Sequence, residues 1–458
     1  MIPQITRVSP CSAAIIDHWI CTGSSNVSAR QMNYIYYKLP PMGNTLLPTL
    51  EDIEKAAQFL RGKINRTPLD YSATLSEQFG CNVYLKLENL QKTGSFKARG
   101  ALFKMNSLSP EERKKGVIAV SAGNHAQGVA YAGTLMNIST KIVMPQNTTP
   151  AKINAVIRYG AEVILKGKDY SEARDHALNL VKEENRVFIE GFNDRWIISG
   201  QGTIGLEILS DLPETDVVIV PVGGGGLISG IALAMKEKKR AIKVIGVQSD
   251  KIDSMKESIG KGKITASVRG ETIADGIAIR LPGDLTFELT RKYVDDVVTV
   301  SDESMAYALF RLLERNKVLV EPSGASTLAA LIENKVEVKG KNVVLVLSGG
   351  NANLLLLSKI IYKSMERESQ LVRIEFNIPD RPGTLYRIAH AISEAGGNIY
   401  HAEVDNLHEE TPVGFQTVVF TVNVRGREHA ERLFSKVSET GFSFSVKGYD
   451  SERPERGN

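Results

Sequence analysis

Short apolar segments alternate with amphipathic ones along most of the chain, from about residue 47 to residue 361. Strands that are buried on both faces of a parallel sheet are almost continuously apolar, and helices connect them. The alternation therefore predicts βα units and a mainly parallel sheet covered by helices on both faces, which is the α/β fold class. The apolar runs predicted as strands are residues 83–88, 117–120, 141–144, 162–165, 187–190, 216–222, 243–247, 297–300 and 342–347.

A different pattern begins at residue 371. Val372, Ile374, Phe376 and Ile378 alternate with polar residues, which predicts a half-buried strand of period two. Helices are predicted at residues 384–394 and 428–439, and further strands at 399–404, 415–424 and 442–446. The order βαββαβ is that of a ferredoxin-like unit, so we expect a second, smaller domain.

These patterns divide the chain into five parts. Residues 1–47 form an N-terminal extension without a clear period, 48–364 the α/β domain, 365–370 a charged linker, 371–446 the ferredoxin-like domain and 447–458 a tail. The extension has serines and arginines but one acidic residue, Asp17, so a transit peptide is one interpretation. A disordered start that precedes Met32 or Met42 is the other, and we assign no function to it.

The composition is that of a soluble globular protein, with 42% hydrophobic and 24% charged residues. The formal net charge of +4 suits anionic small molecules, but Lys and Arg are scattered, which argues against nucleic-acid binding. No apolar stretch reaches the ~20 residues of a membrane span. Cys11, Cys21 and Cys81 form neither a CxxC pair nor a disulfide framework, which favours a reducing, cytoplasmic location.

The first candidate for chemistry is Lys97, which follows a predicted strand in the sequence Gly94-Ser95-Phe96-Lys97. Ser95 is predicted to cap a helix that begins at Phe96. Lys97 would then lie at the positive end of the helix dipole, which disfavours the ammonium form and favours a nucleophilic amine. The alternative is an ordinary solvated lysine.

Four glycines, residues 223–226, follow another apolar run and precede a predicted helix that starts near Leu227. Backbone N–H groups at such a helix end suit a phosphate. The spacing fits neither a dinucleotide-binding G-x-G-x-x-G motif nor a Walker A motif, and a turn that lets strand and helix pack closely is the alternative.

Three polar loops follow predicted strands, at residues 121–125, 223–227 and 348–351. Ligands of open α/β sheets bind beyond the carboxyl ends of the strands, so these loops are expected to line one cleft. A nucleophilic lysine, a site for one phosphate and an asparagine loop together match the needs of pyridoxal phosphate.

Six motifs then carry a resemblance to a known family, at residues 93–100, 121–127, 223–230, 321–325, 348–351 and 378–385. In this order they closely resemble the fold-type II pyridoxal phosphate enzymes, in particular the threonine/serine dehydratases with a C-terminal ACT domain, over about residues 48–446. The resemblance implies a tryptophan synthase β-like fold with two parallel-sheet subdomains, followed by a ferredoxin-like ACT domain.

The resemblance also implies roles for individual residues. Lys97 corresponds to the lysine that binds the cofactor covalently and acts as the catalytic base. The other residues implied to contact pyridoxal 5'-phosphate are Phe96, Asn124, Gly223, Gly224, Gly225, Gly226, Leu227 and Ser348. Those implied to bind the substrate carboxylate are Ser121, Ala122, Gly123, Asn124 and His125. Glu321 is a second-layer or structural residue in this interpretation. His125 is interpreted as a helix cap, with a direct catalytic role as the alternative.

The reaction implied is deamination of L-threonine to 2-oxobutanoate and ammonia, in which the water lost by β-elimination is taken up again on hydrolysis. L-Serine would give pyruvate and ammonia in the same way. A serine racemase-like enzyme is one alternative, but Ala122 stands where such racemases carry a second serine. Such racemases also carry an acidic metal ligand at the end of the strand that corresponds to residues 243–248. Gln248 at this position is a poor ligand for a hard cation, so no magnesium site and no other metal is predicted. The other alternative is an inactive amino-acid sensor.

The ACT resemblance implies an allosteric enzyme and a homo-oligomer, either a dimer or a tetramer. ACT domains commonly bind amino acids between paired copies, and isoleucine or valine is the expected effector, as in isoleucine biosynthesis. The residues implied to contact it are Asp380, Gly383, Thr384, Leu385, Asn398 and Ile399. The alternative is that this domain only promotes assembly.

Overall fold

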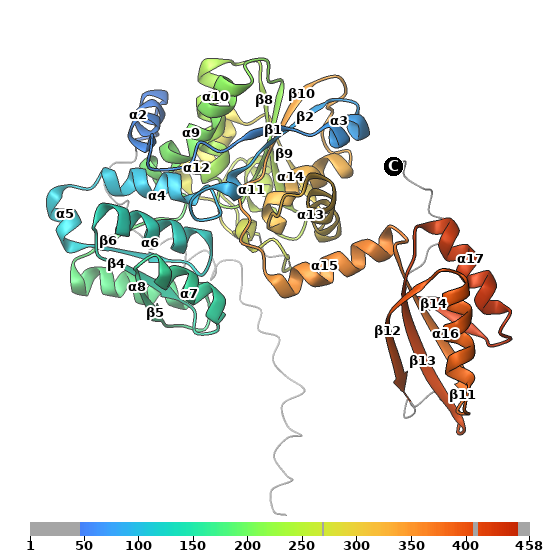
Figure 1. The fold of residues 1–458 in the computed structure, drawn as a ribbon. Helices are drawn as coiled ribbons and strands as arrows, with labels where there is room; N and C mark the ends of the chain where they lie inside the picture. The colour runs from blue at the N-terminus through green and yellow to red at the C-terminus, as the bar shows by residue number, and fades with distance from the viewer. Residues whose placement is uncertain (1–45, 268–269, 406–410, 448–458) are drawn as a thin grey trace, which may run out of the picture. The chain divides into compact units, whose positions relative to one another are not determined.

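The computed structural model describes residues 46–267, 270–405 and 411–447. The N-terminal extension before residue 46, with Cys11 and Cys21, and the tail after residue 447 lie outside the described residues. The described chain forms three sheets (Figure 1).

The largest sheet has six strands in the order β1-β2-β10-β7-β8-β9. All neighbours run parallel except β1, which pairs antiparallel with β2 at one edge. Its strands are β1 (Leu69–Tyr71), β2 (Asn82–Lys86), β7 (Val217–Pro221), β8 (Lys243–Ser249), β9 (Asp296–Val300) and β10 (Asn342–Val346). The helices of this part are α2 (Leu50–Leu60), α3 (Ala73–Phe79), η1 (Glu88–Leu90), α9 (Arg195–Asp211), α10 (Gly226–Lys238), α11 (Ser254–Lys261), η2 (Asp275–Ile277), α12 (Asp284–Tyr293), α13 (Asp302–Asn316), α14 (Pro322–Ile332) and α15 (Leu354–Arg367).

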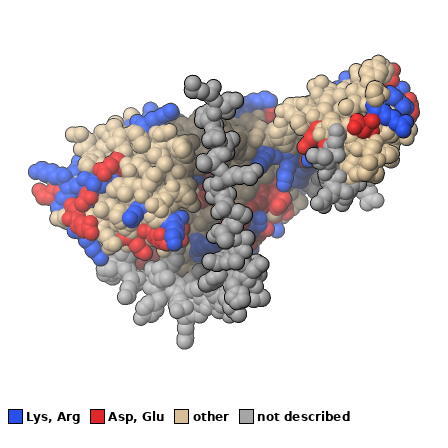
Figure 2. All heavy atoms as spheres, turned by 90° about the horizontal axis from the view of Figure 1, so that it is seen from below, with Lys and Arg blue, Asp and Glu red and all other residues tan. Residues whose placement is uncertain are grey.

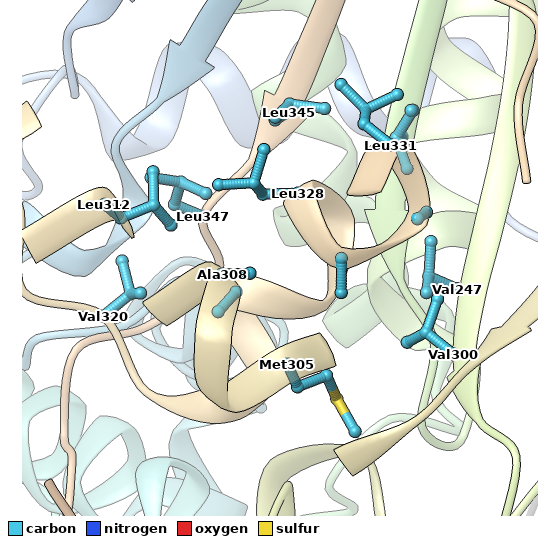
Figure 3. Packing of buried hydrophobic residues seen from close by; sticks show 14 of the residues in the cluster. Val247, Val300, Met305, Ala308, Leu312, Val320, Leu328, Leu331, Leu345 and Leu347 are labelled. Carbon is cyan, nitrogen blue, oxygen red and sulfur yellow. The ribbon is translucent and has the colours of Figure 1, made fainter. Parts of the chain in front are cut away.

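This sheet is buried on both faces, which explains why its strands are continuously apolar. Successive side chains of a strand point to opposite faces. In β10, Val343 and Leu345 join the core under α13 and α14, whereas Val344 and Val346 join the core under α9 and α10. Figure 3 shows the first of these cores, where side chains from α13, α14 and the strands interdigitate.

A second, fully parallel sheet has the order β5-β4-β3-β6. Its strands are β3 (Val117–Val120), β4 (Thr140–Met144), β5 (Glu162–Leu165) and β6 (Val187–Phe188). The surrounding helices are α4 (Lys97–Asn106), α5 (Pro110–Lys115), α6 (Asn124–Met136), α7 (Pro150–Arg158) and α8 (Tyr170–Glu184). The side chains of β3 again divide between two cores, with Val117 toward α4 and α6 and Ile118 toward α8.

The third sheet is antiparallel, in the order β12-β13-β11-β14. Its elements are β11 (Leu371–Pro379), α16 (Thr384–Glu394), β12 (Asn398–Asp405), β13 (Phe415–Asn423), α17 (Arg427–Ser438) and β14 (Phe444–Lys447). One face of β11 carries Ile374, Phe376 and Ile378 into a core with α16 and α17. This is the ferredoxin-like arrangement that the alternating pattern predicted.

The predicted fold class is confirmed, and two local expectations need adjustment. Helix α4 begins at Lys97 with Phe96 as its N-cap residue, so the prediction of Ser95 as the cap is wrong. The backbone of Ser95 instead forms a β-bridge with Gly349, which keeps it outside the helix. The second expectation is the linker at residues 365–370. Helix α15 continues into this segment and ends at Arg367.

The surface agrees with the scattered charges of the sequence. Figure 2 shows basic and acidic side chains interspersed among the described residues on the face in view. Within the described part of the chain, no helix is long and apolar enough to cross a membrane.

A buried charge cluster connects the two parallel-sheet parts. Arg99 of α4 is fully buried and donates to both oxygens of Glu88 and both oxygens of Glu207, at 2.6 to 3.0 Å, and to Thr203 Oγ1 at 3.0 Å. All five guanidinium N–H groups are therefore satisfied. Lys86 Nζ, also fully buried, donates to Glu207 at 2.7 Å and to the Thr67 carbonyl at 2.8 Å. Burial alone would raise the pKa of Glu207, but Arg99 and Lys86 hold this pKa below its ordinary value.

We expect Arg99→Ala to lower the free energy of unfolding by about 3–5 kcal/mol, because it leaves buried carboxylates without their cation. The matched control is Arg291→Ala, which removes an exposed pair with Glu288 and should cost less than about 1 kcal/mol. Urea unfolding followed by far-ultraviolet circular dichroism measures both. Equal effects of the two substitutions would contradict a structural role for the cluster.

Candidate active site

The turn that carries Lys97 is tied to the segment after β10. Gly94 has φ of +70°, and its carbonyl accepts from Gly350 N at 2.9 Å. Phe96 N donates to the Ser348 carbonyl at 3.1 Å. Two loops that are far apart in the sequence thus form one small backbone ladder, and Lys97 follows directly as the first residue of α4.

Protein atoms surround the Lys97 amine. Its Nζ donates to the Gly191 carbonyl at 2.8 Å and lies 5.1 Å from the centre of the Phe96 ring. The residue keeps a partly accessible surface, whereas protein atoms closely surround the amine. Burial lowers the pKa of Lys97 to about 8, and the nearby Glu321 carboxylate opposes this shift. The neutral fraction near neutral pH is therefore larger than that of an ordinary lysine, which favours nucleophilic or basic chemistry.

The glycine loop lies between β7 and α10 and has no room for side chains. A Cβ atom at Gly224 would lie 2.5 Å from the Phe192 ring, and one at Gly226 would lie 2.9 Å from Phe192. Gly225 has φ of +94° and is the N-cap residue of α10, with no side chain capping the helix. Thr286 Oγ1 fixes the loop by donating to the Gly224 carbonyl at 2.6 Å. The result is a helix N-terminus whose backbone N–H groups can receive an anion.

Asn124 connects the other two loops of the site. Its Nδ2 donates to both carboxylate oxygens of Glu321, at 2.8 and 3.0 Å, and its Oδ1 accepts from Asn351 Nδ2 at 2.6 Å. Burial raises the pKa of Glu321 to about 7, and the hydrogen bonds from Asn124 oppose this shift. Glu321, which sequence reasoning left as a second-layer or structural residue, is thus the direct partner of Asn124.

His125 is the second residue of α6 and does not cap it, because Gly123 holds the N-cap position. The imidazole is buried, and its Nε2 lies 3.1 Å from the Ile189 carbonyl. Burial and the nearby Lys97 charge lower the pKa of His125 to about 3, so the ring is neutral. Since a carbonyl can only accept, we assign the proton to Nε2. His125 therefore holds the segment that contains Gly191, whose carbonyl accepts from Lys97.

The structure brings most of the expected site residues together. Lys97, Phe96 and Ser348 meet through the backbone ladder, and Asn124 joins them through Asn351. The glycine loop joins through Phe192, the neighbour of Gly191. Sequence reasoning missed Gly191, Phe192 and Thr286, because none of them lies in a motif. The remaining expected residues lie in the loop before α6, in the loop before α10 and in the first turn of α10, and they are Ser121, Ala122, Gly123, Gly223 and Leu227.

The residues expected to contact an effector lie in the third sheet and form two separate groups. Asp380, Gly383, Thr384 and Leu385 follow the end of β11, where Pro379 pairs with Phe415. Asn398 and Ile399 begin β12, where Asn398 pairs with Asn423. Asn423 also pairs with Leu371, at the other end of β11. The two groups therefore lie at opposite ends of the sheet, about 25 Å apart at ~3.3 Å per residue.

Comparison with family models gives two matches. Residues 60–349 match the pyridoxal-phosphate dependent enzyme family, and residues 366–440 match the ACT domain.

Two relatives are similar to this chain over most of its length. An L-threonine ammonia-lyase of Thermotoga maritima is 45% identical over 400 residues, which are 87% of this chain and 100% of the relative. An L-threonine ammonia-lyase of Geobacter sulfurreducens is 41% identical over 394 residues, or 86% of this chain and 98% of the relative.

The solved structures similar to this chain include a threonine deaminase and a serine racemase. The processed form of threonine deaminase isoform 2 from Solanum lycopersicum has a TM-score of 0.66 and 37% identity, and covers 71% of this chain and 98% of its own. Maize serine racemase also has a TM-score of 0.66, with 36% identity, and covers 71% of this chain and 100% of its own. The fold alone therefore does not separate the two activities.

The lowered pKa of Lys97 predicts a stability effect that depends on pH. A lysine whose pKa is lower in the folded state than in the unfolded state reduces stability as pH falls from the ordinary value of 10.5 to the folded value of about 8, and the loss is complete below that value. In protein freed of small ligands, Lys97→Met should therefore raise the free energy of unfolding by about 2–3 kcal/mol near pH 6.5, and by less than half of that near pH 9.5.

Urea unfolding at both pH values measures this difference. Lys261→Met, at an exposed position of α11, is the control and should change stability little at either pH. A Lys97→Met effect that is independent of pH would contradict the lowered pKa.

Proposed function

This chain belongs to the pyridoxal-phosphate dependent enzyme family, and on that premise we propose that it deaminates L-threonine to 2-oxobutanoate and ammonia. L-Serine would give pyruvate by the same route. The observation that carries the proposal is a lysine amine with a pKa lowered to about 8, held in one site with a helix N-terminus that no side chain caps. The named relatives that extend over both domains are L-threonine ammonia-lyases.

The residues present fit the cofactor. A Cβ atom would fill the cradle at residues 223–226, and the backbone N–H groups there can bind its phosphate. Thr93 Oγ1, Ser95 Oγ and Ser323 Oγ are buried without a hydrogen-bond partner among the described residues, so the site has polar capacity left for a ligand. Lys97 would bind the cofactor covalently, with Asn124, Ser348 and Phe96 as contacts to its ring.

When bound, pyridoxal phosphate supplies an aldehyde that takes up the substrate amine and a ring that withdraws electrons from it. The chain supplies the proton chemistry and the orientation. The Lys97 amine, neutral in part near pH 8, acts as the base that takes the proton from the substrate Cα. Loss of the β-hydroxyl as water, followed by uptake of water and release of ammonia, balances the conversion of threonine to 2-oxobutanoate.

Two neighbouring groups direct the outcome. The loop of residues 121–125 offers backbone N–H groups at the start of α6, which can orient the substrate carboxylate. Ser348 provides a hydroxyl, which cannot keep a proton on a ring nitrogen as a carboxylate can. This difference favours elimination over transfer of the amino group.

Ala122 argues for ammonia release over racemisation. Inversion at Cα needs a proton donor on the face opposite to Lys97, and a methyl group has no proton to give. The similarity to maize serine racemase therefore supports a shared fold and does not support racemase activity.

The third sheet supports regulation by an amino acid through assembly. A free amino acid is much shorter than the ~25 Å that separate Asp380 from Asn398 within one copy. Both groups can contact one effector only when two copies pair in opposite directions, which is the symmetric pairing usual in dimers. We therefore propose a homo-oligomer in which isoleucine or valine binds between paired ACT domains.

We expect the protein to convert L-threonine to 2-oxobutanoate, and Lys97→Ala to lower the rate by at least ~100- to 10,000-fold, because it removes the base and the covalent attachment. Recovered L-serine should contain little D-serine. Assay of the 2-oxo acid and chiral chromatography measure the two results. Formation of D-serine as fast as pyruvate would contradict the argument from Ala122, and near-normal turnover in Lys97→Ala would contradict the proposed function.

We also expect isoleucine or valine to change the rate of threonine deamination, and Asn398→Ala to raise the effector concentration needed by about tenfold or more, a loss of ~1.4 kcal/mol of binding. Glu403→Ala, exposed on the same strand, is the matched control and should leave the response unchanged. An identical response in Asn398→Ala would place the effector site elsewhere.

A further inference from the structure

The Asn351 side chain, at the end of the loop of residues 348–351, reaches both of the other site segments. Its Nδ2 donates to Asn124 Oδ1 at 2.6 Å and to the Thr93 carbonyl at 3.0 Å. Thr93 directly precedes the turn that leads to Lys97, and Asn124 begins α6. One amide therefore joins the lysine turn to the residue expected to contact the cofactor ring.

The direction of this hydrogen-bond chain is fixed at both ends. In its ionised form, above a pKa of about 7, the Glu321 carboxylate only accepts, so Asn124 then turns its Nδ2 toward it. Asn124 then presents its oxygen to Asn351, and the Thr93 carbonyl also only accepts. Both N–H groups of Asn351 are consequently required, one for each acceptor.

Close packing adds a second restraint. A Cβ atom at Gly94 would lie 2.8 Å from Asn351 Oδ1 and 3.3 Å from its Cγ. The backbone of the same loop also holds the turn, since Gly350 N donates to the Gly94 carbonyl at 2.9 Å. The Asn351 side chain thus lies directly against the turn, three residues before Lys97.

We propose that Asn351 is a positioning residue for the deamination, which sets the orientation of the Asn124 amide and the placement of the Lys97 turn. This inference rests on the proposed function. Asn351 acts through these two neighbours, so its loss should disturb the geometry of the reacting groups more than the binding of substrate.

Asn351→Asp tests the proposal with little change in shape. The aspartate has only acceptor atoms, and these would face the Asn124 oxygen and the Thr93 carbonyl. We expect kcat for threonine to fall by about 10- to 100-fold with KM changed less than about threefold, because misplacement of reacting groups affects the chemical step. Asn351→Ala removes the donors without adding opposed acceptors and should show a smaller loss.

The matched control is Asn353→Asp, the same chemical change two positions later. Asn353 Oδ1 caps α15 by accepting from the backbone N–H groups of Leu355 and Leu356, at 2.9 and 3.2 Å, and an aspartate keeps this role. Asn353→Asp should leave kcat and KM within about twofold of wild type.

A spectroscopic measurement separates this proposal from the proposed function. The circular dichroism of bound pyridoxal phosphate reports its orientation, whether or not threonine is the substrate. We expect this signal and the cofactor dissociation constant to change in Asn351→Asp but not in Asn353→Asp. An unchanged cofactor signal and kcat in Asn351→Asp, or a loss of thermal stability alone, would overturn the positioning role. A wild-type protein that binds the cofactor but does not deaminate threonine would overturn the proposed function instead.

Discussion

Full hydrogen bonding of one buried guanidinium constrains how the two parallel-sheet parts fit together. Arg99 lies two residues after Lys97, and its donors reach Glu88 behind β2 and Glu207 on α9. A buried charge tolerates little displacement, because loss of either partner leaves an uncompensated ion in a dry interior. The helix that carries the lysine is thus fixed in its position by electrostatics as well as by packing.

The charge cluster keeps its groups ionised, whereas burial in the candidate site shifts two groups toward their neutral forms. In the cluster, two cations face two carboxylates, and Arg99 and Lys86 keep the pKa of Glu207 low. In the site, burial moves the pKa of Lys97 down to about 8 and the pKa of Glu321 up to about 7. Both shifts bring the groups toward neutrality near physiological pH, where proton transfer to and from them requires little free energy.

The sequence predicts the sheets better than it predicts the contacts within the site. Apolar runs identify the strands because burial on both faces leaves a continuous signature, and the period of two in β11 identifies the third sheet. The pairing of Asn124 with Glu321 spans 197 positions, and that of Asn124 with Asn351 spans 227. No local pattern encodes such pairs. Ser95 shows that a local signal can also mislead. Serine is a good capping residue, but the backbone of Ser95 forms a β-bridge with the distant Gly349, and Phe96 is the N-cap residue of α4.

The register of the third sheet also has a consequence for how the protein responds to its own abundance. Asn398 pairs with Asn423 at one end of the sheet, and Pro379, just before Asp380, pairs with Phe415 at the other. For any effector that contacts both groups, occupancy requires the encounter of two chains. Its apparent affinity then rises with the concentration of the protein itself. For such an effector, the sensitivity of the enzyme would depend on how much of the enzyme the cell contains.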